Sequence, residues 1–316
     1  MNPALSVILL TTLIGAGQGL FVALVAADLG ARFAAWAALP EAFVARAAGL
    51  ALALLVAGLA ASFFHLGRPL RAWRSAAQWR TSWLSREVIA LPLAMALVAL
   101  YGAAQLPLGS ALRPHADWIG VLGVLACLAL YVCTGMIYAC LRFLQEWATP
   151  LTVVNFTLLG AASGFSIAAA LARLDGLESA TGFALSAAAL TVFGLLGRTA
   201  SLLRNARLRR SSTLATAIGI KHPRIVQSAA GFLGGSFNTR EFFHGRKDAF
   251  VRQVKWLFLG GAFALPLLLL GAALGQGAAA WFVAAPLVQW SGLLLERWYF
   301  FAEAKHPQNL YYSAIA

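Results

Sequence analysis

Two ionisable residues stand at the ends of one polar stretch that has a long apolar segment on each side. The stretch runs from His65 to Glu87, reads HLGRPLRAWRSAAQWRTSWLSRE, and contains five arginines. A carboxyl group and an imidazole can both exchange protons with a substrate, so these two residues could form a proton-handling pair. The pair requires that the two apolar segments are neighbouring antiparallel helices whose ends lie at the same depth.

Each residue also has an interpretation without chemistry. A glutamate in the first turn of a helix is favoured by the helix dipole, and Ser85 could cap that helix. A histidine at the end of an apolar helix can extend into the membrane interface, and Arg86 could form a surface pair with Glu87. The spacing alone favours these structural interpretations, because ionisable groups in membranes are functional by default only when they are buried.

The composition predicts an integral membrane protein. Hydrophobic residues make up 61% of the 316 residues, charged residues only 11%, and the mean hydropathy is +0.78. The apolar runs are continuous and roughly 20 residues long, which suits helices that cross the bilayer rather than the shorter alternating strands of a barrel. We therefore predict an all-α fold with about eight transmembrane helices, at about 5–27, 47–64, 88–106, 118–143, 151–171, 183–203, 256–274 and 281–295, the last two separated by a short GQG turn.

With eight spans, both termini and the even-numbered connections lie on one side of the membrane. That side holds 20 of the 24 Lys and Arg residues and six of the 11 acids, a balance of +14, whereas the other side has a balance of −1. The positive-inside rule predicts that this basic face is cytoplasmic. Its charges could bind anionic lipids, and the long connection 204–255, with aromatics among its charges, could dock a partner subunit. Nucleic acid is not an expected partner.

A short repeat predicts two four-helix bundles, at 1–145 and 146–316. In each half, the second predicted helix ends in a Gly-Arg pair that leads into a basic connection, at Gly67-Arg68 and at Gly197-Arg198. A four-plus-four arrangement would place both large basic connections on the same face.

The sequence predicts no haem, no iron–sulfur cluster and no other metal in this chain. Only His65 stands at a membrane boundary, whereas a transmembrane haem needs two facing histidines. The three cysteines fall on one predicted helix at a spacing unlike that of any cluster motif, so they are interpreted as packing residues.

Four motifs resemble one family of membrane proteins. FHLGRPLRAWRS, SWLSREV, NTREFFHG and LLLERWYFFAEAKH occur in order at span ends, and together they resemble the DmsC-like family, the membrane anchor subunits of dimethyl sulfoxide reductase-type complexes. The resemblance covers essentially the whole chain and implies a multi-pass protein of the bacterial inner (plasma) membrane. It implies an anchor that holds an iron–sulfur subunit and a molybdopterin catalytic subunit at the membrane and oxidises menaquinol, or reduces a quinone if the complex runs in reverse.

The resemblance also implies the site. In that family, the residues that match His65 and Glu87 are associated with quinol binding. Glu87 would then accept a proton, His65 would hydrogen-bond the quinol, and Arg68 or Arg71 would hold Glu87 ionised.

Three alternatives remain open from the sequence. The family includes anchors of cytoplasmic sulfite-oxidising complexes that reduce quinone, and the basic face suits such a complex. A transporter is disfavoured, because Gln18, Asn155 and Pro266 are isolated in their spans and the GAGQG motif beginning at Gly15 is first interpreted as close helix packing. The third alternative is a scaffold without a quinone site.

Overall fold

The computed structural model describes residues 1–33, 36–209, 213–222, 224–225 and 244–307. Within them the regular structure is helical, and eight segments are long and apolar enough to cross a membrane. The prediction of an all-α, multi-pass membrane protein with eight spans is therefore confirmed. The elements are α1 (Leu5–Arg32), α2 (Glu41–Phe63), η1 (Pro69–Gln78), α3 (Trp83–Ala104), η2 (Pro107–Gly109), η3 (Arg113–His115), α4 (Ala116–Ala139), α5 (Pro150–Leu174), α6 (Ser179–Ala206), α7 (Leu214–Ile218), α9 (Asp248–Leu259), η4 (Gly260–Ala264), α10 (Leu265–Gln276) and α11 (Ala279–Glu303).

The end of the last span differs most clearly from its prediction. The apolar run ends at Leu295, yet α11 continues to Glu303. Glu296 and Arg297 interrupt the hydropathy of the run without ending the helix, because both side chains are buried and paired inside the bundle. The short turn before this span is confirmed: α10 ends at Gln276, and Gly277 follows with a φ of 67°, which suits a glycine.

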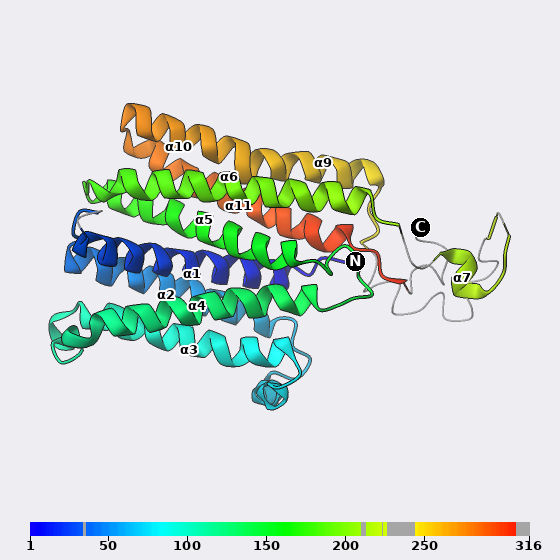
Figure 1. Cartoon of the computed structure of the whole chain (residues 1–316), viewed down its shortest axis with the longest axis horizontal. Helices are drawn as coiled ribbons and strands as arrows, with labels where there is room; N and C mark the ends of the chain where they lie inside the picture. The colour runs from blue at the N-terminus through cyan, green and yellow to red at the C-terminus, as the bar shows by residue number, and fades with distance from the viewer. Residues whose placement is uncertain (34–35, 210–212, 223, 226–243, 308–316) are drawn as a thin grey trace.

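The spanning helices lie side by side, and the N-terminus lies at the same end of the bundle as the end of α11 (Figure 1), where the Met1 amino group donates to the Ala304 carbonyl at 2.7 Å. Helices α1 and α5 are the most buried spans and pack against each other. A Cβ atom at Gly164 of α5 would overlap backbone atoms of Gly19 and Leu20 of α1, so the two backbones are in direct contact. This confirms that the GAGQG motif serves close helix packing.

One hydrophobic core joins the two halves of the chain. Buried residues of this core come from both sides of the predicted boundary at residue 145, and they include Ile14, Phe43, Leu91, Leu130, Phe165, Phe183, Leu270 and Phe282. The division into two bundles stays a prediction. The two Gly-Arg pairs that suggested it are not equivalent in the structure, since Arg68 is exposed in the connection after α2, whereas Arg198 lies inside α6 and is 2% exposed.

The two ends of the bundle differ in how their charges are paired. At the end away from the termini, Arg32 pairs with Asp117, Arg46 with Asp175 at 2.6 Å, and Arg113 with Glu41 at 2.6 Å. Arg173 donates to the carbonyl of Gly277. These four cations at this end are therefore satisfied within the chain. The excess of positive charge belongs to the end that carries the N-terminus, η1 and α7.

The polar stretch that follows α2 begins with η1 and ends where α3 begins. The Ser82 hydroxyl caps α3 by accepting from the Ser85 amide at 3.4 Å, so the expected cap at Ser85 is wrong by one turn. Arg86 donates to the carbonyls of Trp79 and Arg80, each at 2.9 Å, rather than pairing with Glu87. The other large connection runs from α6 to α9, and most of its motifs, including GFLGGSF, lie outside the described residues.

Candidate functional site

Glu87 is a buried carboxylate one turn inside α3. Its side chain is hydrogen-bonded by Thr134 of α4, whose hydroxyl donates to Glu87 Oε1 at 2.5 Å. Glu87 is 7% exposed and Thr134 is 3% exposed, so the contact lies within the packed interface of α3 and α4. The burial that distinguishes a functional membrane carboxylate from an interfacial one is therefore present at Glu87.

His65 lies just beyond the end of α2, at the same end of the bundle as Glu87. Its Nδ1 atom is 3.2 Å from the Ser6 hydroxyl of α1. Partial burial lowers the pKa of His65 below its ordinary value of 6.5, so the ring is neutral at pH 7. Within the described part of the chain, no hydrogen bond or ion pair joins His65 to Glu87: His65 contacts α1 through Ser6, whereas Glu87 contacts α4 through Thr134.

Arg68 and Arg71 do not approach Glu87. Both side chains are exposed, and neither forms an ion pair with the Glu87 carboxylate. Arg68 precedes η1 and Arg71 lies within it, and that helix runs across the ends of the spans rather than into them (Figure 1). Thr134 is the partner that the structure gives to Glu87, and the binding role of the two arginines stays a prediction.

An aromatic cluster extends from the Glu87 region into the second half of the chain. Tyr138 stacks on Phe156 with the ring centroids 5.5 Å apart, and it lies within electrostatic range of both Glu87 and Arg297. Trp147 stacks on Phe300 at 5.2 Å and donates its indole N–H to the Phe300 carbonyl at 2.9 Å. These rings join the α4–α5 connection to the end of α11.

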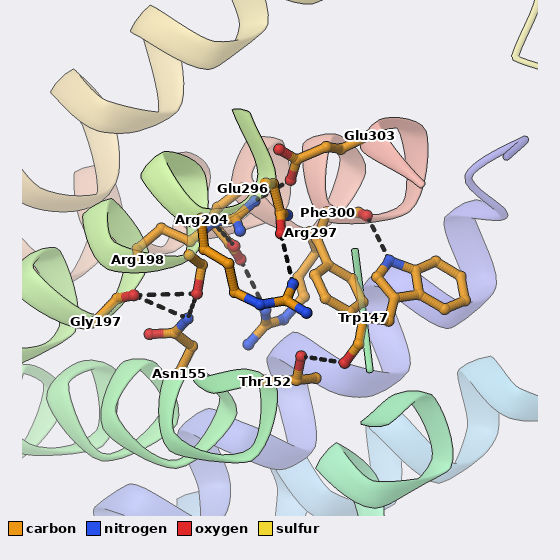
Figure 2. Close-up of polar contacts among 12 residues, drawn as sticks. Trp147, Thr152, Asn155, Gly197, Arg198, Arg204, Glu296, Arg297, Phe300 and Glu303 are labelled. Atoms are coloured by element: carbon orange, nitrogen blue, oxygen red, sulfur yellow. Dashed lines mark hydrogen bonds and ion pairs between the residues drawn. The ribbon is translucent and has the colours of Figure 1, made fainter. Parts of the chain in front are cut away.

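A second group of buried charges lies beside these rings, between α6 and α11 (Figure 2). Arg198 Nε lies 2.8 Å from Glu296 Oε1, and Arg297 donates to Glu296 Oε2 at 2.8 Å. The guanidinium of Arg297 also lies 3.7 Å from the centre of the Phe156 ring. Glu296 is fully buried, so its charge is compensated by the two arginines rather than by bulk solvent.

The buried charges belong to a ladder of polar pairs at a constant spacing. Gln289 donates to Thr191 at 2.9 Å, Arg198 pairs with Glu296, and the side chains of Asn205 and Glu303 are hydrogen-bonded. Each step advances seven residues on both helices, so every pair has the same offset of 98 residues. Helices α6 and α11 therefore run in the same direction with one fixed register along the second half of α11.

A small polar cavity adjoins the ladder. It has a volume of about 10 Å³ and is lined by residues of α5, α6 and α11, among them Asn155, Arg198, Ser201 and Glu296. Asn155 donates to the Ser201 hydroxyl at 2.8 Å, while its own carbonyl oxygen is buried without a partner among the described residues. The size and the polar lining suit one water molecule.

The sequence interpretation missed this ladder and Thr134. Arg198 and Arg297 were counted with the basic face, although both are buried. A signal was present, because the polar residues of α6 and of α11 recur every seven residues within otherwise apolar helices. Thr134 offered no comparable signal, since a single threonine in an apolar helix is common.

Comparison with known proteins decides the family. Residues 1–231 match the family model of the DMSO reductase anchor subunit (DmsC). The chain belongs to the DmsC family. It is also 54% identical, over 325 aligned positions that cover the whole of both chains, to a sulfite dehydrogenase subunit of Allochromatium vinosum. The DmsC family makes the chain a membrane anchor of a molybdoenzyme complex, with catalytic and electron-transfer subunits as its partners.

Proposed function

We propose that this DmsC-family anchor binds quinone at the end of the bundle where α2 finishes and α3 begins, between Glu87 and His65, and passes it electrons from a partner iron–sulfur subunit. The observation that carries the proposal is the burial of the Glu87 carboxyl group against Thr134 at the end of the bundle that bears the basic connections. An ionisable group with a dedicated partner inside a membrane protein is seldom kept for packing alone.

We further propose that the electrons come from sulfite. The relative with 54% identity over its full length is named as a sulfite dehydrogenase subunit. The positive-inside rule puts the basic face in the cytoplasm, which suits a complex whose catalytic subunits are cytoplasmic. Oxidation of sulfite with water yields sulfate, two electrons and two protons, and a quinone takes up two electrons and two protons to become a quinol.

The residues of the site would supply hydrogen bonds and protons. Glu87 is held in place by Thr134, so its free oxygen can face a quinone oxygen. The neutral ring of His65 has one N–H to donate and can relay a proton from the surface. Arg68 and Arg71 would act at the mouth of the site through their positive charge. The proposal assigns no haem and no iron–sulfur cluster to this chain, so electrons would arrive directly from the docked partner.

The description of the family model favours a second candidate function. The DMSO reductase anchor subunit serves a complex that reduces its substrate, so this chain could oxidise menaquinol at the same residues in anaerobic respiration. In that case Glu87 and His65 would accept the two protons that quinol releases. Assays of the purified complex with sulfite plus quinone, and with quinol plus dimethyl sulfoxide, distinguish the two directions.

The test is the replacement of Glu87 by Gln in the complex purified with its partner subunits. We expect quinone turnover to fall at least tenfold, because the amide cannot exchange a proton, while sulfite oxidation with a soluble dye acceptor stays unchanged. R46Q, at an exposed pair on the opposite face, is the matched control. Unchanged quinone turnover in E87Q would overturn the proposal, and loss of the partner subunits from E87Q would favour a scaffold.

A further inference from the structure

The segment between α2 and α3 exposes large apolar side chains on its surface. Leu70 is 94% exposed, Phe64 87%, Trp73 71% and Trp79 52%. Tryptophans gather where a membrane protein meets the headgroup layer, because the indole ring is apolar on its faces and polar at its N–H. We call residues 63–80 the interfacial segment.

The interfacial segment also carries uncompensated positive charge. Arg68, Arg71, Arg74 and Arg80 are exposed, and no acidic residue occurs between Leu66 and Arg86. The next acid, Glu87, is buried against Thr134. At the opposite face of the protein the four arginines are satisfied within the chain, whereas the arginines of this segment are open to an external anion.

Arginine and tryptophan alternate along the segment in contact with each other. The Arg74 guanidinium lies 5.4 Å from the Trp73 ring centre, and the Arg80 guanidinium lies 5.3 Å from the Trp79 ring centre. Each pair presents a cation beside a flat apolar surface. A phospholipid offers the matching arrangement, with a phosphate beside the start of its acyl chains.

The orientation of η1 places these pairs at one depth. Figure 1 views this helix nearly along its axis, beside the beginning of α3, whereas the spans lie across the view along the length of the bundle. It lies where α2 ends and α3 begins, so it runs along the plane of the membrane surface. Arg86, in the first turn of α3, donates hydrogen bonds to the carbonyls of Trp79 and Arg80 and so fixes the end of the segment against α3. A helix at this depth with apolar and cationic side chains has the properties of an interfacial membrane anchor.

We propose that the interfacial segment binds anionic phospholipids, with Leu70, Trp73 and Trp79 in the bilayer and Arg74 and Arg80 on lipid phosphates. The surface of a soluble partner subunit would meet these side chains less well, since it would have to cover a nearly bare leucine and two tryptophans at the level of the headgroups. The inference goes beyond the proposed quinone site and does not depend on it. It leaves the rest of the basic face for the partner subunits.

The first test measures lipid binding by the full-length chain. Phosphatidylglycerol is titrated into the detergent-solubilised protein, with phosphatidylcholine of the same acyl chains as reference, and bound lipid is counted by native mass spectrometry. R74Q/R80Q should lose at least half of the preferential phosphatidylglycerol binding. R207Q/R252Q, which removes two exposed arginines elsewhere on the basic face, should keep it. Equal loss in both variants, or no loss in R74Q/R80Q, would overturn the proposal.

The second test measures depth in phosphatidylglycerol nanodiscs and holds even if lipid binding is weak in detergent. A spin label is attached at W73C in a C140S background, since Cys140 is the exposed native cysteine. The label should be relaxed by membrane-soluble oxygen and shielded from a water-soluble nickel complex. A label fully open to the nickel complex, or one that becomes shielded only when the partner subunits bind, would identify the segment as a protein dock and overturn the proposal.

Discussion

Arg198 of α6 and Glu296 of α11 form an ion pair of 2.8 Å with side-chain exposures of 2% and 1%. Glu296 holds a second arginine, Arg297, at 2.8 Å, and Arg198 also lies 3.6 Å from Glu303. Glu296 is thus an acid shared by two buried cations. Its removal takes the paired acid from Arg297 and leaves Arg198 only the longer contact with Glu303, whereas removal of Arg198 leaves the Glu296–Arg297 pair intact.

We therefore expect E296Q to destabilise the protein more than R198Q does. Loss of one member of a buried ion pair costs on the order of 3 kcal/mol of folding stability. R198Q added to E296Q should restore part of that stability, because it removes one of the two buried cations that Glu296 had paired. The readout is the melting temperature of the purified chain in nanodiscs. R46Q, which breaks an exposed pair, should change it little, since such pairs contribute about 0–1 kcal/mol. Equal effects of E296Q and R198Q would contradict the shared-acid arrangement.

Thr134 should support quinone chemistry through its hydroxyl alone. T134V keeps the shape of the side chain and removes the donor to Glu87, so we expect quinone turnover to fall severalfold, less than in E87Q. T134S keeps the donor and should retain most of the turnover. Both are measured in the intact complex, with a dye acceptor as the assembly control. Equal turnover in T134V and T134S would show that the hydrogen bond has no part in the reaction.

His65 should contribute a step to the pH profile of quinone turnover. Burial lowers its pKa, so the ring is neutral above the ordinary value of 6.5 and gains its charge only as the pH falls through the lowered value. We therefore expect the change in wild-type turnover to lie at a pH below the ordinary pKa of 6.5. H65Q keeps a hydrogen-bonding side chain that does not titrate, and it should lose that step while retaining some activity. A step that persists in H65Q belongs to another group.

The close contact of α1 and α5 should be intolerant of a single methyl group. G164A would drive its Cβ into the backbone of Gly19 and Leu20, so the helices must separate or the protein must fail to assemble. G271A makes the same substitution in α10, where nothing lies within 4 Å of the added atom, and should be tolerated. Expression and melting temperature of the two variants compare the sites directly. A stable G164A protein would show that the two helices can move apart at little cost.

The sequence was most informative where hydropathy alone decides the structure. The eight spans, the short turn before the last of them and the packing role of GAGQG all follow from apolar length and glycine placement. The position of Glu87 in the sequence made it a candidate. Its partner, Thr134, lies on α4, and the sequence does not show which helix packs beside α3. The expected contact of Arg68 or Arg71 with Glu87 did not form, because η1 turns across the span ends.

The count of charges on the basic face was misleading for two arginines that are buried in the structure. A count by connection assigns Arg198 and Arg297 to the basic face, since an arginine near the end of an apolar run is normally at the surface. Their burial depends on Glu296, which is distant in sequence from Arg198 and becomes a neighbour only when α6 and α11 pack. The seven-residue recurrence on both helices is the local clue to that pairing.

The shared register of α6 and α11 has a consequence for biosynthesis. Helix α6 leaves the ribosome with Arg198 in a membrane segment, and an unpaired arginine within a span opposes insertion by up to about 3 kcal/mol. The ladder partner of Arg198, Glu296, is made 98 residues later, in the last span of the chain. The sixth helix therefore cannot reach its final state during its own translation, and a nascent chain that stops before α11 should present α6 to quality-control proteases as an incompletely inserted segment.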